Sequence, residues 1–226
     1  MRLEKATGIH YQTKQDLVYS TLRHAIMHCD LLPGARLVIE DIAQQLSVSP
    51  IPVREALHLL QSEGLVEMTP HVGAIVAPIA PSAITEIFTI LEGLEVVATR
   101  TAAQRITAAN FLELSAINQE MDEVLERQAF ERWPDLNSKF HRTISSFTGM
   151  TMLQEMTHRI FDRWDRVRRY YFSDVLIHRL DIAQQEHHAI LEAMRTRNYS
   201  ELERLIKQHN QGALISYTAY IEAKEA

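Results

Sequence analysis

The chain has 226 residues, of which 46% are hydrophobic and 23% are charged, and its net charge is −6. This composition is typical of a folded globular protein with one or two domains, and no apolar run approaches the roughly 20 residues that a membrane-spanning helix needs. The segment 1–15 lacks the apolar core of a signal peptide. Cys29 is the single cysteine and cannot form an internal disulfide. We therefore expect a cytoplasmic protein.

Apolar residues three or four positions apart predict three helices in the first third of the chain, over about residues 14–28, 40–46 and 50–62. Pro33-Gly34 separates the first two helices. Ser49 is a favourable N-cap for the third, and Pro50 follows it in the first turn, where a missing N–H costs no hydrogen bond.

The pattern then changes to two short β-prone runs, at residues 65–68 and 74–77, with Pro70-His71-Val72-Gly73 between them. Such a pair predicts a β-hairpin with a glycine in its turn. Three helices followed by a hairpin is the order of a winged helix-turn-helix domain. Because Pro78 and Pro81 enclose a short stiff linker, we place the domains at residues 1–78 and 79–226.

From Ser82 onward the sequence shows only helical periodicity. We expect helices over about residues 82–106, 110–127, 133–148, 152–172, 176–197 and 201–223. Thr151 with Gln154 and Ser200 with Glu203 are predicted to be capping boxes. The predicted fold class is therefore mainly α, with a winged helix-turn-helix followed by an all-helical bundle of about six helices.

Three motifs occur in order within residues 22–78: Leu-Pro-Gly-x-x-Leu (32–37), Pro-Val-Arg-Glu-Ala-Leu (52–57) and Glu-Gly-Leu-Val (63–66). Together they resemble the DNA-binding domain of the GntR family of bacterial regulators. The helical remainder, through Phe140-His141 and Glu186-His187-x-x-Ile190, resembles the C-terminal FCD domain of the FadR subfamily. The resemblance implies a homodimeric transcription factor, most often a repressor, which reads a palindromic operator and responds to a small-molecule effector.

The GntR resemblance implies that residues 50–62 form the recognition helix. Arg54 would then contact a guanine edge or a phosphate, although it could instead be a solvated arginine paired with Glu55. Ser49 could cap the helix, donate to a phosphate, or do both. His71 and Gly73 match the wing segment that approaches the minor groove, with an ordinary turn as the alternative.

One departure from the family concerns the start of this helix, where Pro50 and Ile51 replace the usual arginine and threonine. A proline cannot hydrogen-bond a base, and Ile51 can make only apolar contact, for example with a thymine methyl group. We therefore expect an operator that differs from the common consensus of the family.

Three histidines, His141, His187 and His209, lie on three different predicted helices, and the FCD resemblance implies that they bind a divalent metal. The fourth ligand of the family is often an aspartate four residues before the first histidine, which is Asn137 here. Asn137 and His141 share a helix face, because four residues advance by only about 40°. A neutral amide and three imidazoles favour Zn or Ni over Ca or Mg. The alternative is that these are ordinary interior histidines.

The effector is less well defined by the sequence. Many relatives carry an arginine near the start of the sensor domain that can hold a ligand carboxylate, but residues 86–95 contain none. A small organic acid bound to the metal is one possible effector. The basic stretch 163–169 could supply charge to it, or could be a solvated or dimer-facing surface.

Two other functions are consistent with parts of the sequence. A three-histidine site with an open position could make the protein a metal-dependent hydrolase, although there is no His-Glu-x-x-His motif. A helical module that binds protein rather than DNA is the second. It would explain why residues 1–78 contain six lysines and arginines against eight aspartates and glutamates.

Overall fold

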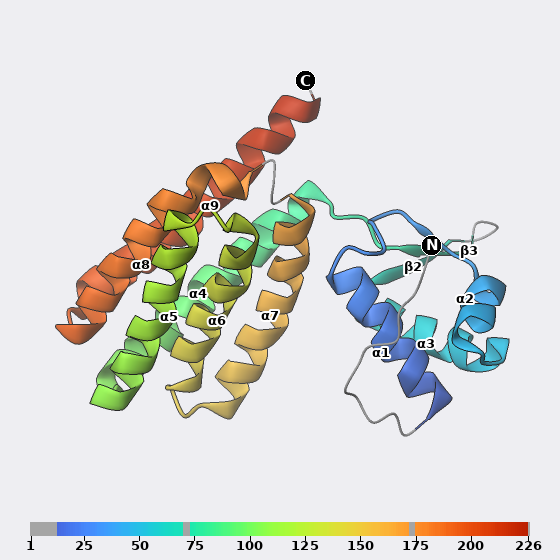
Figure 1. Cartoon of the computed structure of the whole chain (residues 1–226), viewed down its shortest axis with the longest axis horizontal. Coiled ribbons are helices and arrows are strands. Elements are labelled where there is room, and N and C mark those ends of the chain that lie inside the picture. The colour runs from blue at the N-terminus through green and yellow to red at the C-terminus, as the bar shows by residue number, and fades with distance from the viewer. Residues whose placement is uncertain (1–12, 70–72, 172–174, 226) are drawn as a thin grey trace. The chain divides into compact units, whose positions relative to one another are not determined.

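The computed structural model describes residues 13–69, 73–171 and 175–225, and the chain divides into two compact units, Met1–Ile79 and Ala80–Ala226. Each unit is described by itself (Figure 1). Among the described helices, none is long and apolar enough to cross a membrane.

The first unit contains three helices and a small sheet. The elements are α1 (Lys14–Met27), β1 (Arg36–Leu37), α2 (Ile39–Leu46), α3 (Pro50–Ser62), β2 (Val66–Thr69) and β3 (Gly73–Val76). Both strand pairs are antiparallel, in the order β1-β3-β2. The core is built from the apolar faces of all three helices, with Leu22, Ile42 and Leu57 fully buried. This arrangement confirms the predicted winged helix-turn-helix fold. The two-residue strand β1 was not predicted, because it is too short for a periodic signal.

Ser49 occupies the N-cap position of α3, but its side chain makes no capping hydrogen bond. The reason is in the sequence that follows. A capping hydroxyl accepts from the backbone N–H of the second or third helical residue, and the third residue of α3 is Pro52, which has no N–H. The Ser49 hydroxyl is therefore left exposed at the start of the helix.

The second unit is entirely helical in its described part. It contains α4 (Pro81–Arg105), α5 (Ala108–Glu126), η1 (Phe130–Arg132), α6 (Trp133–Ser146), α7 (Thr151–Tyr170), η2 (Leu176–Arg179), α8 (Leu180–Arg195) and α9 (Tyr199–Glu225). Helix α4 packs against α6, α7, α8 and α9. An apolar cluster in this unit includes the fully buried Phe140, Ile190 and Ile206. The predicted helical bundle is thus confirmed.

The helix ends differ from the prediction in three places. Met150, not Thr151, is the N-cap of α7, and its side chain makes no capping bond. Helix α9 begins at Tyr199, and the Asn198 side chain accepts from the backbone N–H of Glu201 at 3.3 Å, so Ser200 is not its cap. The helix expected over 176–197 is divided into the 3-10 turn η2 and α8. Both predicted capping boxes were therefore wrong.

Two isoleucines on α8 allow a test of this core. Ile190 is fully buried, whereas Ile182 is 54% exposed. We expect Ile190→Ala to reduce the free energy of unfolding by about 2–5 kcal/mol, because it leaves a cavity, and Ile182→Ala to change it by less than about 0.5 kcal/mol. Urea unfolding followed by the fluorescence of Trp133 and Trp164 measures both. Equal effects of the two substitutions would contradict the packing described.

Candidate metal centre

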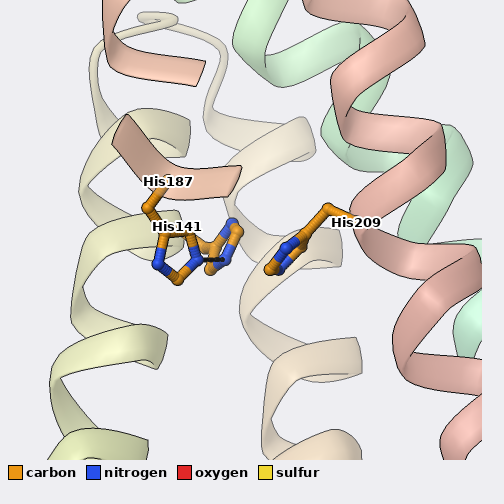
Figure 2. A group of neighbouring side chains, drawn as sticks. All are labelled: His141, His187 and His209. Carbon is orange, nitrogen blue, oxygen red and sulfur yellow. Dashed lines mark hydrogen bonds between the residues drawn. The ribbon is translucent and has the colours of Figure 1, made fainter. Parts of the chain in front are cut away.

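Three buried histidines from three helices meet in the core of the helical unit. His141 lies on α6, His187 on α8 and His209 on α9, and one ring nitrogen of each lies within 4.8 Å of the others. Figure 2 shows the three rings directed toward one another, with His209 approaching from the side opposite to His141 and His187. The structure therefore brings together the three histidines singled out in the sequence.

The outer nitrogen of each ring faces an acceptor. His141 Nδ1 lies 2.5 Å from Glu95 Oε1, His209 Nδ1 lies 2.7 Å from Glu186 Oε2, and His187 Nδ1 lies 3.3 Å from Gln184 Oε1. Ionised carboxylates and amide oxygens only accept hydrogen bonds, so each Nδ1 carries the proton and donates. Each Nε2 is then left with a lone pair. Metal-binding histidines are typically held in this way, because the second contact fixes the tautomer and the ring orientation.

The inner nitrogens of two rings are close enough to share a metal ion. His187 Nε2 and His141 Nε2 are 3.3 Å apart, within hydrogen-bond distance of each other. When both rings are neutral and donate their Nδ1 protons to other acceptors, two lone pairs face each other there. Two nitrogens that share a tetrahedral Zn ion lie at about this separation, since each Zn–N bond is about 2.0–2.1 Å long. The spacing and the donor set therefore fit a metal ion of that size.

Asn137 supplies a further donor beside the histidines. It is buried on α6, one turn before His141, and its Oδ1 makes no hydrogen bond with any described residue. The side chain lines the same cavity of about 20 Å³ as His141 and His209. An unpartnered buried oxygen is unfavourable unless another group binds to it, so this atom also fits a metal ligand.

The two carboxylates behind the histidines are held ionised. Burial alone would raise the pKa of Glu95, but the charge and hydrogen bond of His141, with a hydrogen bond of 2.7 Å from Asn210 Nδ2, hold it below its usual value. Burial likewise opposes ionisation of Glu186, and the contacts with His209 and Arg179 lower its pKa. Neither carboxylate is available as a general base, because each one accepts hydrogen bonds from a histidine and from a second donor.

His187 is held neutral. Its complete burial, followed by the nearby His209 and His141, lowers its pKa well below the usual value. Gln184 holds the ring from behind, and its own amide nitrogen donates to Asp122 Oδ1 at 2.8 Å, which orients its oxygen toward His187. A neutral ring binds a metal without first losing a proton.

In the first unit, the side chains expected to contact DNA lie on the surface. Ser49, Ile51 and Arg54 are exposed at the beginning of α3, Ile51 by 65%. Arg54 forms no ion pair with Glu55 or with any other described residue. Gly73 begins β3 with a φ of 95°, a left-handed value that favours glycine. His71 lies outside the described residues.

Comparison with known proteins identifies the family. Residues 14–76 match the family described as bacterial regulatory proteins of the gntR family, and residues 86–212 match the FCD domain. This chain belongs to the GntR-family regulators with an FCD domain.

Individual relatives agree with this assignment. The HTH-type transcriptional repressor RspR of Escherichia coli K12 is 26% identical over 86% of this chain and 84% of its own length. The solved structure of E. coli McbR/YncC is 25% identical, covers 93% of this chain and 100% of its own, and has a TM-score of 0.74. A GntR structure from Rhodococcus sp. RHA1 has the same TM-score at 21% identity, over 93% of this chain and 98% of its own. The chain is therefore a DNA-binding transcriptional regulator of the GntR type rather than a hydrolase.

Several important residues of the regulator were not identified from its sequence. Glu95, Gln184, Glu186 and Asn210 surround the histidines. Three of them lie close to a histidine in the sequence, since Gln184 and Glu186 precede His187 and Asn210 follows His209. Asn210 and Glu95 are separated by 115 positions, and no local pattern connects them.

The basic stretch 163–169 is not the uniformly solvated surface considered from the sequence. Arg166 is buried, and Arg168 is fully buried with its guanidinium 2.9 Å from Asp165 Oδ1. Neither is among the described residues that line the cavity beside the histidines. Trp164 is the residue of this stretch that lines the cavity, so its arginines give no support to a charged contact with an effector there.

The neutral state of His187 predicts how acid affects the metal-free regulator. The unfolded chain binds a proton at His187 near pH 6.5 and the folded chain does not, so stability is complete above about pH 6.5 and falls below it. The loss is up to about 1.4 kcal/mol for each pH unit until the folded histidine is itself protonated. Urea unfolding in EDTA at several pH values measures it. We expect a shallower dependence in His187→Gln, and an unchanged one in the exposed control His158→Gln. The same dependence of the unfolding free energy on pH in the wild-type protein and in both variants would contradict the neutral state of His187.

Proposed function

We propose that the regulator is a homodimeric repressor whose DNA binding is controlled by a small organic acid at a Zn or Ni centre formed by Asn137, His141, His187 and His209. The observation that carries the proposal is the convergence of one ring nitrogen from each of the three histidines, each ring held by an acceptor at its Nδ1, beside the unpartnered oxygen of Asn137. Repression is supported by the similarity to RspR, which is named a repressor.

The donor set favours the borderline transition metals. Three neutral imidazoles and one amide oxygen suit Zn or Ni, whereas Ca and Mg prefer several carboxylate or water oxygens. The absence of a carboxylate from the immediate ligands makes binding weaker than in relatives with an aspartate at this position. When bound, the ion would supply positive charge that attracts the carboxylate of an effector.

In the DNA-binding unit, α3 would enter the major groove and the hairpin would approach the minor groove. Arg54 would read a guanine or contact a phosphate, Ile51 would make an apolar contact, and the uncapped Ser49 hydroxyl is available to a phosphate. Gly73 and His71 would lie in the wing. Because this unit carries no excess of positive charge, two copies on a palindrome would be needed for useful affinity.

Metal content is the first test of this function. We expect about one Zn or Ni ion per chain in the purified regulator, and its loss in His187→Ala, because that substitution removes one of three imidazole ligands. His188→Ala is the matched control, since His188 is exposed and contacts Asp122 instead. Asn137→Asp should bind the ion more tightly, because it restores a negative charge. A wild-type protein that takes up no metal after soaking in Zn or Ni would overturn the metal centre.

The DNA contacts are tested separately. We expect Arg54→Ala to weaken binding to an operator by about 1–3 kcal/mol, roughly 5- to 150-fold in affinity. The logarithm of affinity should also depend less steeply on salt if the contact is a phosphate. Arg163→Ala removes an exposed arginine of the helical unit and should leave both values unchanged. Identical binding by Arg54→Ala and wild type would remove Arg54 from the interface.

A further inference from the structure

A second pocket shares Arg179 with the cavity beside the histidines. Its volume is about 480 Å³, and its walls come from η2, α8 and α9, with polar groups from His178, Gln208 and Ser216. The cavity beside the histidines measures about 20 Å³, which is room for about one water molecule. An organic acid of several carbons therefore fits the outer pocket and not the inner cavity.

Arg179 is the only described residue that lines both spaces. It is buried at the end of η2, and its Nη2 donates to both carboxylate oxygens of Glu186 at 2.8 and 2.7 Å and to the backbone oxygen of His209 at 3.4 Å. Its Nε and Nη1 make no hydrogen bond with the described residues. A guanidinium that uses one nitrogen for its structural contacts retains donors for a second carboxylate.

Gly212 on α9 permits this position of the guanidinium. A Cβ atom at Gly212 would lie 2.4 Å from Arg179 Nη2, so any side chain there would displace the arginine. Glycine inside a helix is about 1 kcal/mol less favourable than alanine. The close approach of Arg179 supplies a physical reason for this residue in the middle of α9.

The charges around the two spaces make anion binding depend on the metal. The described residues that line them include two carboxylates, Glu95 and Glu186, and the guanidinium of Arg179. A divalent ion on the histidines would add two positive charges beside them. An anion in the outer pocket is therefore expected to bind the loaded protein more tightly than the metal-free one.

We infer that the outer pocket is the binding site for the body of a small carboxylic acid, and that Arg179 holds its carboxylate through the N–H groups of Nη1. The inference rests on the proposed function and refines it, because it places the effector beside the metal centre, on Arg179, rather than on the ion itself. Through Glu186, which contacts both Arg179 and His209, the acid acts on a metal ligand without entering the inner cavity. By reciprocity, the acid must then raise metal affinity by the same factor that the metal raises acid affinity.

The test uses succinate and malonate as probes, because both are weak chelators and neither strips the metal. Isothermal titration of the Zn-loaded wild-type protein should show binding, weakened at least about tenfold in Arg179→Gln and in metal-free wild type. Succinamide, the neutral analogue, should not bind. Binding of both acids by Arg179→Gln as tightly as by wild type, or no binding by loaded wild type, would overturn the inference.

Because Arg179→Gln leaves Glu186 buried without its cation, a second variant keeps the charge. Gly212→Ala displaces the guanidinium and should also weaken succinate binding, whereas Gly93→Ala, a helical glycine with open space around it, should not. Circular dichroism confirms that each variant is folded, and metal analysis reports the centre independently. If both variants retain metal, and Arg179→Gln and Gly212→Ala bind the acid as tightly as the wild-type protein does, this inference alone is overturned. Absence of metal uptake in wild type would overturn both it and the proposed metal centre.

Discussion

The helical unit depends on the burial of two ionised carboxylates in its core. Taking a carboxylate out of water is unfavourable by several kcal/mol unless partners replace the lost hydration. Glu95 receives hydrogen bonds from His141 and Asn210, and Glu186 from His209 and Arg179. These contacts join α4, α6, α8, α9 and η2, so the same interactions that satisfy the charges also fix the positions of the histidines. A substitution at either carboxylate is therefore expected to disturb the fold and the site together.

This polar core is incomplete in one place. Every outer nitrogen of the three histidines is satisfied, but the inner nitrogens of His141 and His187 face each other and the oxygen of Asn137 has no described partner. A bound cation would resolve both deficiencies at once. Because it would bind the folded chain and find no such site in the unfolded one, metal binding and stability are thermodynamically linked. The deficiency in the apolar interior is thus the physical basis of the ligand site.

The helices and the hairpin could be predicted because each buries a periodic apolar face. The centre could be predicted only in part: the family resemblance pointed to the histidines, but Glu95 reaches His141 from α4, and no local pattern reports a contact between residues so far apart in the sequence. Gln184 is different, because it lies three residues before His187 on α8. Arg168 is different, because it follows Phe161 and Trp164 at helical spacing on the buried face of α7. The spacing of the apolar residues could have predicted that Arg168 is buried, but the neighbouring basic residues suggested an exposed surface instead. Caps were missed where proline or a neighbouring asparagine changed the local hydrogen bonding.

In the DNA-binding unit, contact with a phosphate depends more on side chains than on backbone N–H groups. Pro50 and Pro52 both lie in the first turn of α3 and remove two of the backbone N–H groups that a helix start normally offers to a phosphate. Contact with DNA must then come from side chains such as Ser49 and Arg54, in a unit without excess positive charge. A single copy would bind weakly, so affinity would depend steeply on how well two copies match the spacing of two half-sites. If the regulator is a homodimer as proposed, only a small change in the geometry of that dimer would be needed to release its operator. A ligand in the helical unit would make such a change if it bound one arrangement more tightly.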